Sequence, residues 1–199
     1  MAEDKLITDN YKKHTAQNPV QKFLINNFLK TLLKEAGKLK PQSILDVGCG
    51  EGFTLQKLRE NKIGKELVGI DFSDRAIQIG KKLHPHISLN PGTIYHIPFK
   101  ADSFDLVICS EVLEHLEDPK KALLELQRVT KKNCIISVPH EPWFMLANLL
   151  RAKNISRWGN DIEHIQHWSK RGINETVKKY LNVTSIKNPF PWTLLVSKK

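Results

Sequence analysis

Three polar side chains in the stretch EVLEHL, residues 111–116, could do chemistry together. Glu111, Glu114 and His115 follow the apolar run FDLVICS, which is typical of a buried strand. If EVLEHL opens a helix, the three residues stand at positions i, i+3 and i+4 and share one face. Two carboxylates and an imidazole on one face could hold a divalent metal or move protons. They could also be the capped, solvated start of a helix.

A second group of candidate residues begins with ILDVGCGEG, residues 44–52. A strand-like run leads there into three alternating glycines, and a helical pattern follows. Glycine lets the backbone turn sharply and approach a ligand at the start of a helix. Asp46 is poorly placed beside a pyrophosphate, but it suits a ligand with a cationic amino acid portion. A dinucleotide fingerprint would also require glycine at position 53, where the chain has Phe53.

Asp71 ends the next strand-like run, VGID. A carboxylate at this place can accept two hydrogen bonds from ribose hydroxyls. Together, Asp46 and Asp71 require a ribonucleoside with an ammonium group and no phosphate, which describes S-adenosylmethionine. The alternative is that both aspartates only cap the helices that follow them.

The elements that must position these residues alternate between strands and helices. Continuous apolar strands are typical of a parallel sheet that is covered on both faces, and such sheets bind ligands beyond the carboxyl ends of their strands. The longest predicted helix begins at Pro19 and ends near Gly37, with apolar residues at three- and four-residue steps. The other predicted helices are 53–61, 74–83 and 119–130, and the predicted strands are 43–47, 67–71, 87–90, 104–110, 133–138, 182–187 and 192–197.

The composition is that of one ordinary globular domain. The chain has 199 residues, of which 40% are hydrophobic and 26% charged. It has no apolar run near the ~18 residues of a membrane span and no secretory signal, and its three cysteines cannot form a disulfide framework. We therefore expect a reducing, cytoplasmic location. The net charge of +10 suits an anionic partner such as nucleic acid, a phosphorylated substrate or a lipid head group, or it is simply a solvated basic surface.

These motifs resemble those of the class I S-adenosylmethionine-dependent methyltransferases, in the methyltransferase type 11 branch that includes the ubiquinone-biosynthesis enzymes. The resemblance covers roughly residues 40–140. It rests on LDVGCGEG, GIDFS, IPFKADSFDLVICSEVLEHLEDP and the strand ending SVP. It implies a Rossmann-like α/β fold with a mostly parallel seven-stranded sheet, helices on both faces and an antiparallel C-terminal hairpin.

The resemblance also implies roles for single residues in binding S-adenosylmethionine. One departure from the family pattern concerns the adenine, because Thr93 stands where the family usually has an acidic residue. A threonine hydroxyl can still accept from the adenine amino group, but without charge assistance. The implied cofactor residues are Asp46, Gly48 and Gly50 at the methionine end, Asp71 at the ribose, Phe72, Thr93 and Ile94 at the adenine, and Ser110.

Three interpretations of EVLEHL remain open. In the first, Glu111 starts a helix at the positive end of its dipole and His115 packs nearby. In the second, Glu111, Glu114 and His115 bind Mg²⁺, Mn²⁺ or Zn²⁺ together with His164 from EHIQHWS. This set is similar to the metal site of ubiquinone-pathway and small-RNA O-methyltransferases. In the third, His115 or His140 is a general base without metal.

The chain is expected to form a single methyltransferase domain, residues 1–199. Its parts are an N-terminal cap helix (1–40), a cofactor-binding core (41–140), a substrate lid (141–180) and C-terminal strands (181–199). We expect the helix from Pro19 to cover the cofactor and to pack against the sheet, with peripheral membrane contact as a weaker alternative. Aromatic and basic residues of the lid would choose the acceptor.

The main functional hypothesis is methyl transfer from S-adenosylmethionine to a small-molecule or lipid-like acceptor, at oxygen. A metal-dependent RNA 2′-O-methyltransferase is one alternative, which the net charge favours and the lack of room for an RNA-binding domain opposes. A non-catalytic cofactor-binding protein is the other. The sequence names neither the acceptor nor the oligomeric state.

Overall fold

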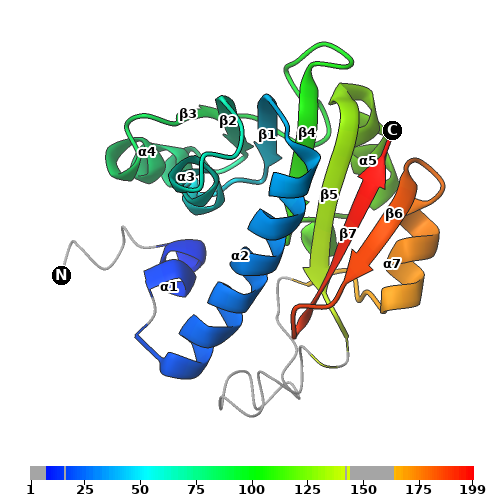
Figure 1. Cartoon of the computed structure of the whole chain (residues 1–199), viewed down its shortest axis with the longest axis horizontal. Coiled ribbons are helices and arrows are strands. Elements are labelled where there is room, and N and C mark those ends of the chain that lie inside the picture. The colour runs from blue at the N-terminus through cyan, green and yellow to red at the C-terminus, as the bar shows by residue number, and fades with distance from the viewer. Residues whose placement is uncertain (1–7, 16, 142, 144–163) are drawn as a thin grey trace.

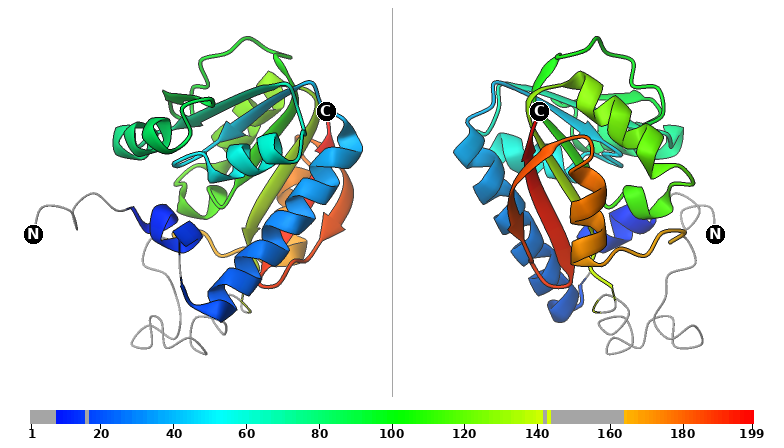
Figure 2. Two further views of the ribbon diagram at one scale, coloured as in Figure 1. Left: turned by 60° about the vertical axis from the view of Figure 1, so that its left-hand side comes forward. Right: turned by 90° about the vertical axis from the view of Figure 1, so that its right-hand side faces the viewer.

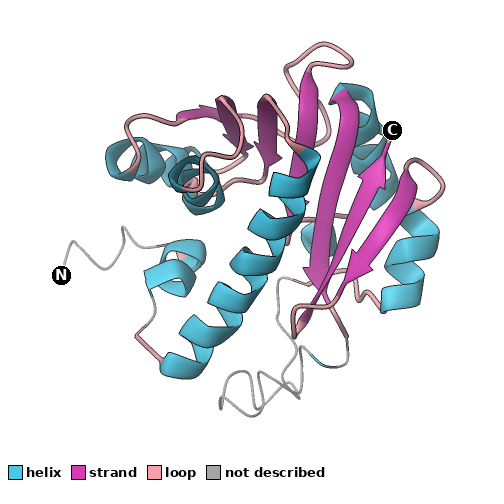
Figure 3. Ribbon diagram, viewed as in Figure 1, coloured by secondary structure: helices cyan, strands magenta, loops and turns pink. Residues whose placement is uncertain are grey.

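A computed structural model describes residues 8–15, 17–141, 143 and 164–199 of the chain. Its centre is a seven-stranded sheet in the order β3-β2-β1-β4-β5-β7-β6 (Figures 1 and 3). The first five strands pair in parallel, and β7 pairs antiparallel with both β5 and β6. This is the α/β fold that the sequence predicted, including the C-terminal hairpin.

The strands form where the sequence has short apolar runs, and the burial pattern explains why. Four consecutive residues of β1, from Ile44 to Val47, are buried, because both faces of the sheet are covered. The strands are β1 Ser43–Val47, β2 Glu66–Asp71, β3 Ser88–Pro91, β4 Phe104–Ser110, β5 Thr130–Pro139, β6 Asn182–Lys187 and β7 Trp192–Lys198. Three of them match the predicted bounds, and the ends of the others differ by one to three residues.

The helices begin at polar caps that the sequence carries locally. Asn18 accepts hydrogen bonds from the backbone amides of Val20 and Gln21, and a proline follows it at the first helical position. Ser73, Asp118 and Ser169 cap later helices in the same way. The helices are α1 Asp9–Thr15, α2 Pro19–Leu39, α3 Phe53–Glu60, α4 Asp74–Leu83, α5 Pro119–Val129 and α7 Lys170–Val177.

Two apolar clusters cover the two faces of the sheet. Ile44 belongs to the cluster that α2, α3 and α4 complete, whereas its neighbour Leu45 belongs to the cluster that α5 and α7 complete. This alternation follows from the two-residue period of a strand. Figure 2 shows α2 on one face of the sheet and α5 and α7 on the other.

One expectation needs correction. EVLEHL does not open a helix: Glu111 has a positive φ of 57°, only Leu113–His115 form a short 3₁₀ turn (η2), and α5 begins at Pro119. The Glu111 amide still donates to the carbonyl of Ser137 in β5, so the chain turns at the strand end instead of starting a helix.

The helix from Pro19 packs along the sheet as α2, as expected, and its cover of the cofactor stays a prediction. The segment that reaches the glycine loop is α1, as side-chain contacts from residues 8–15 show. In the part of the chain that the structure describes, no helix is long and apolar enough to cross a membrane. Of the expected lid, residues 144–163 lie outside the described residues.

Candidate active site

The glycine loop lies at the carboxyl end of β1, where the strand order reverses direction. β1 pairs with β2 on one side and with β4 on the other, so the loop stands at the topological switch point of the sheet. Gly48, Gly50 and Gly52 have φ values of 78°, 54° and 83°, which a residue with a Cβ rarely adopts. A side chain on Gly48 would also collide with Val112 of EVLEHL. The loop and EVLEHL are therefore packed directly against each other.

Asp71 fixes this loop from the end of β2. Its Oδ2 accepts from the backbone amide of Gly50 at 2.8 Å, and its Oδ1 accepts from the amide of Ser73 at 2.9 Å. Burial raises the pKa of Asp71, and these two hydrogen bonds oppose the shift. Each carboxylate oxygen can accept a further hydrogen bond. Asp71 can thus shape the loop and still bind two ribose hydroxyls.

Asp46 is the more strongly perturbed of the two aspartates. Only 2% of its surface is exposed, and burial together with repulsion from Asp71 raises its pKa to about 7. A buried carboxylate of this kind gains most from a cationic ligand. The ammonium group of an amino acid would supply that charge.

The expected adenine side is flat and apolar. Phe72 is 86% exposed, which leaves its ring open to a planar ligand, and Ile94 is buried beneath the turn that follows β3. The Thr93 hydroxyl accepts from the amide of Tyr95 at 3.3 Å, so it is already engaged inside its own turn. Ser110, at the end of β4, shares a 2.8 Å hydrogen bond with Ser137.

Two residues of α5 hold the segment that directly follows the turn after β3. The sequence did not predict these contacts. Glu125 accepts from the amide of Ile97, and Arg128 donates to the carbonyls of Ile97 and Phe99. Glu125 and Arg128 also pair with each other, and the hydrogen bond from Arg128 lowers the pKa of Glu125 to about 2. The only signal in the sequence was a pair of opposite charges at i and i+3 of a helix, which is common on solvated surfaces.

The structure splits the polar residues of EVLEHL into two groups. Among the described residues, Glu114, His115 and His164 bring one ligand atom each to within 4.8 Å of one another. Glu111 is not in this cluster, because its carboxylate pairs with Lys13 of α1. Glu111 thus stands apart from the other three residues of the predicted clamp, whereas His164 does come beside His115, with ring centroids 5.1 Å apart. Metal binding by these residues stays a prediction.

Glu114 is the unusual member of this cluster. It is 1% exposed, and neither of its carboxylate oxygens receives a hydrogen bond from the described part of the chain. Burial and repulsion from Glu111 raise its pKa well above the usual range. Its backbone carbonyl accepts from the amides of Ile165 and Gln166, and these bonds bring His164 into place. A buried carboxylate without a partner indicates a missing proton or cation.

His140, the other candidate base, follows the end of β5. Its amide donates to the carbonyl of Pro191 at 2.9 Å, and burial, with repulsion from Lys170, lowers its pKa. It is not a member of the Glu114 cluster. Its role as a base stays a prediction.

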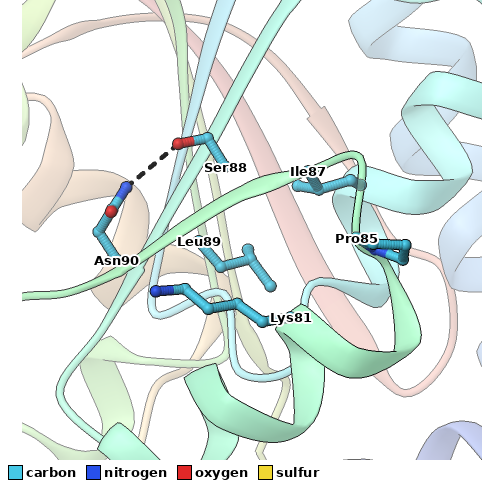
Figure 4. A pocket seen from close by; sticks show the side chains of 6 residues that line it. All are labelled: Lys81, Pro85, Ile87, Ser88, Leu89 and Asn90. Carbon is cyan, nitrogen blue, oxygen red and sulfur yellow. Dashed lines mark hydrogen bonds between the residues drawn. The ribbon is translucent and has the colours of Figure 1, made fainter.

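A separate hollow lies at the outer edge of the sheet, along β3 (Figure 4). Among the described residues, its lining has no carboxylate and no histidine, and the labelled Asn90 donates to Ser88 within it. Its lining is Lys81, Pro85, Ile87, Ser88, Leu89 and Asn90. It offers no chemistry comparable to the strand ends that carry Asp46, Asp71 and Glu114.

Comparison with known proteins agrees with this geometry. Residues 45–138 match a family model described as a methyltransferase domain. The chain is 34% identical over 102 residues to a demethylmenaquinone methyltransferase of Renibacterium salmoninarum, which covers 51% of this chain and 42% of that protein. It is 31% identical over 133 residues to the mitochondrial ubiquinone biosynthesis O-methyltransferase of Schizosaccharomyces pombe. This alignment covers 62% of this chain and 47% of that protein. The chain thus spans about half the length of these relatives.

Solved structures show the same fold over nearly the whole chain. The PH0226 protein of Pyrococcus horikoshii superposes with a TM-score of 0.73 at 21% identity, over 96% of this chain and 99% of that one. Magnesium protoporphyrin IX methyltransferase from Synechocystis, with bound S-adenosylhomocysteine, superposes with a TM-score of 0.68 at 17% identity. The superposition covers 99% of this chain and 92% of that one. Residues 45–138 thus match the methyltransferase domain family, and the chain has the fold of these solved structures.

Proposed function

We propose that the protein transfers a methyl group from S-adenosylmethionine to an oxygen of a small-molecule or lipid-like acceptor. One observation carries the proposal: the carboxylates of Asp46 and Asp71 meet at the switch point of the sheet, beside a loop of three left-handed glycines. The ammonium and ribose groups of S-adenosylmethionine match these two carboxylates. The relatives named for demethylmenaquinone and ubiquinone biosynthesis support a quinone-like acceptor.

The reaction needs alignment and the removal of one proton. The acceptor oxygen forms a bond to the methyl carbon while the bond from that carbon to sulfur breaks, and S-adenosylhomocysteine leaves. The hydroxyl proton must pass to a base, and His115 is our candidate because it lies in EVLEHL, whose Val112 packs against Gly48 of the loop. Asp46 would hold the amino acid end of S-adenosylmethionine, so that the sulfonium methyl faces the acceptor oxygen.

The cluster of Glu114, His115 and His164 also fits a divalent metal. The two unpartnered oxygens of buried Glu114 favour a cation, and one carboxylate with two imidazoles suits Zn²⁺ or Mn²⁺ better than Mg²⁺, which prefers oxygen ligands. Such an ion would act as a Lewis acid on the acceptor oxygen. A cytoplasmic location belongs to the same proposal, and the three cysteines, which are free and buried, agree with it.

The test measures transfer of a labelled methyl group to a catechol or quinol acceptor, with and without Zn²⁺ or Mn²⁺. We expect Asp71→Asn to weaken S-adenosylmethionine binding at least about tenfold by calorimetry, since two ribose hydrogen bonds to a charged acceptor are lost. Asp74→Asn, at an exposed acid of α4, is the matched control. Unchanged affinity in folded Asp71→Asn protein would refute the cofactor site.

The same assay decides between the alternatives. If RNA binds tightly, with an affinity that falls steeply as salt rises, and becomes methylated, the acceptor class is wrong and the net charge of +10 has an RNA partner. If no acceptor ever receives the label while cofactor binds, the protein is a cofactor-binding protein without activity.

A further inference from the structure

Residues 8–15, which we term the strap, reach the glycine loop from the other end of the sequence. Glu51 of that loop has no exposed surface. Both of its carboxylate oxygens accept hydrogen bonds from the strap: Thr8 donates to Oε1, and the Asn10 amide donates to Oε2 at 2.5 Å. A buried carboxylate needs such donors, so Glu51 ties the strap to the loop.

A second contact fixes the strap to the other side of the switch point. Lys13 pairs with Glu111, directly after the end of β4, and its ammonium group also lies 5.4 Å from the centre of the Trp192 ring. Burial alone would raise the pKa of Glu111, but the attraction and hydrogen bond from Lys13 outweigh it, so this pKa lies below its usual range. The pair is therefore an ionic contact at the site's edge.

An aromatic contact also anchors the strap on α3. His14 stacks on Phe53, the first residue of α3, with ring centroids 4.6 Å apart and planes 13° from parallel. Tyr11 lies against the same ring at 6.0 Å. The strap is thus anchored at the loop after β1, at the start of α3 and at the end of β4.

These anchors place Asn10 directly over the cofactor loop. A Cβ on Gly50 would come within 2.5 Å of Asn10 Nδ2. Figure 2 shows α1 as a short separate helix on the side of the molecule where α3 lies. Because the strap runs from the β1 loop to the β4 end, it spans the crevice that an open α/β sheet offers to its ligand.

We infer that the strap forms the outer wall of the cofactor site, and that Asn10 and Lys13 are positioning residues that close it over the amino acid end of S-adenosylmethionine. The inference rests on the proposed function, because it assumes that cofactor. Release of S-adenosylhomocysteine then requires the Lys13–Glu111 and Asn10–Glu51 contacts to open. The strap also covers Glu51, which has no exposed surface, so water screens the interaction of this carboxylate with its donors only weakly.

The test follows the dissociation of S-adenosylhomocysteine from the full-length protein by stopped-flow fluorescence. We expect Lys13→Met and Asn10→Ala each to speed dissociation about tenfold, because each removes a contact that holds the strap on the loop or on the end of β4. The melting temperature without ligand should fall for Asn10→Ala, which takes a donor from fully buried Glu51, and change little for Lys13→Met, because Glu111 is partly exposed. Lys13→Arg keeps the charge and should restore slow release. Lys22→Met, at a lysine of α2 that bonds only locally to Gln17, is the matched control and should behave as the wild type.

Each outcome separates the strap from the proposed function. If the wild type binds no S-adenosylhomocysteine, the cofactor assignment itself has failed. If it binds and the variants release it at the wild-type rate, the strap is only structural and the inference is overturned. Tighter binding by the variants would also overturn it, because the strap would then compete with the cofactor. Hydrogen exchange at residues 8–15 should slow when ligand is added.

Discussion

At the scale of residues, the candidate site brings acidic side chains together in a chain that is basic overall. Asp46, Glu51 and Asp71 lie at the loop after β1, and Glu111 and Glu114 lie in EVLEHL, which packs against that loop through Val112, while the chain as a whole carries a net charge of +10. Lys13 compensates one of these acids, and backbone amides compensate Asp71. Burial raises the pKa of Asp46 and of Glu114, and repulsion from a neighbouring acid, Asp71 and Glu111 respectively, adds to it. These are the two positions at which a cation from outside would be most strongly favoured.

Asp46 should make cofactor binding depend on pH. Its pKa of about 7 means that it is mostly neutral below that pH and ionised above it. Since a cationic ligand prefers the ionised form, S-adenosylmethionine affinity should rise as the pH passes upward through about 7, with release of a proton. Calorimetry in buffers of different ionisation enthalpy measures that proton. Asp46→Asn should bind more weakly and show a flat profile; an equally steep profile in the variant would exclude Asp46 as its source.

The same group has the opposite effect on folding. Because the pKa of Asp46 is higher in the folded protein than its ordinary value of 3.8, the folded state holds this proton over a range in which the unfolded state has lost it. The free energy of unfolding should therefore fall as pH rises from about 4 to about 7. Urea denaturation should show a smaller fall for Asp46→Asn than for the wild type. A fall of equal size in both would place the proton elsewhere.

Glu114 should cost stability in protein without metal. Replacing its buried, unpartnered carboxylate by a neutral amide in Glu114→Gln should raise the free energy of unfolding by about 1–3 kcal/mol. The same variant should lose any rise in melting temperature that Zn²⁺ or Mn²⁺ gives the wild type. Glu117→Gln, at an exposed acid nearby, serves as the control and should keep that rise. A metal response retained by Glu114→Gln would remove Glu114 from the cluster.

At the scale of elements, glycines show how tightly the helices press on the cofactor loop. Gly80 of α4 faces that loop, and a Cβ there would lie 2.6 Å from the backbone oxygen of Glu51. Gly37 of α2 has only ordinary contacts, with Ile63 at 3.5 Å. Because Gly80 has no side chain, α4 can pack directly against the loop at this position.

Alanine at these two glycines should have opposite effects. Gly80→Ala gains helix propensity but must displace backbone, so it should destabilise the fold by about 1–3 kcal/mol and weaken cofactor binding. Gly37→Ala gains the propensity without a collision and should stabilise by up to about 1 kcal/mol. Chemical denaturation of both variants measures the difference. Equal stability would contradict the close contact between α4 and the loop.

At the scale of the whole molecule, α2 and α5 hold the sheet from opposite faces. Leu32 of α2 is fully buried in the cluster that contains Ile44 and Leu194, so it connects the N-terminal helix to strands from both halves of the sheet. The same helix follows directly after the strap in the sequence. Its packing therefore fixes where the strap ends.

Leu32→Ala should lower the free energy of unfolding by about 2–5 kcal/mol, because it leaves a cavity in the core. Leu124→Ala, on α5, removes the same atoms from a side chain that is 52% exposed and should cost less than about 0.5 kcal/mol. The midpoints of urea unfolding compare the two directly. A small effect of Leu32→Ala would mean that α2 is not part of the cooperative core.

The sequence by itself determined the sheet, its flanking helices and the cofactor loop. Apolar runs and helical periodicity depend on neighbouring residues, so β1, β4 and β6 could be predicted to the residue. Asp46, Asp71 and the glycines stand within or beside those runs, and their positions at the strand ends follow from the strands themselves.

Only the tertiary structure decided which carboxylates act together. Glu111 stands apart from the group of Glu114, His115 and His164 and pairs with Lys13, which is 98 residues away in the sequence, whereas Glu114 stays with His164 because a returning segment bonds to its carbonyl. The sequence did not predict the strap either, because seven helical residues are too few to show a helical periodicity. Local pattern fixes strands and turns, whereas the pairing of charges depends on distances that only the folded chain sets.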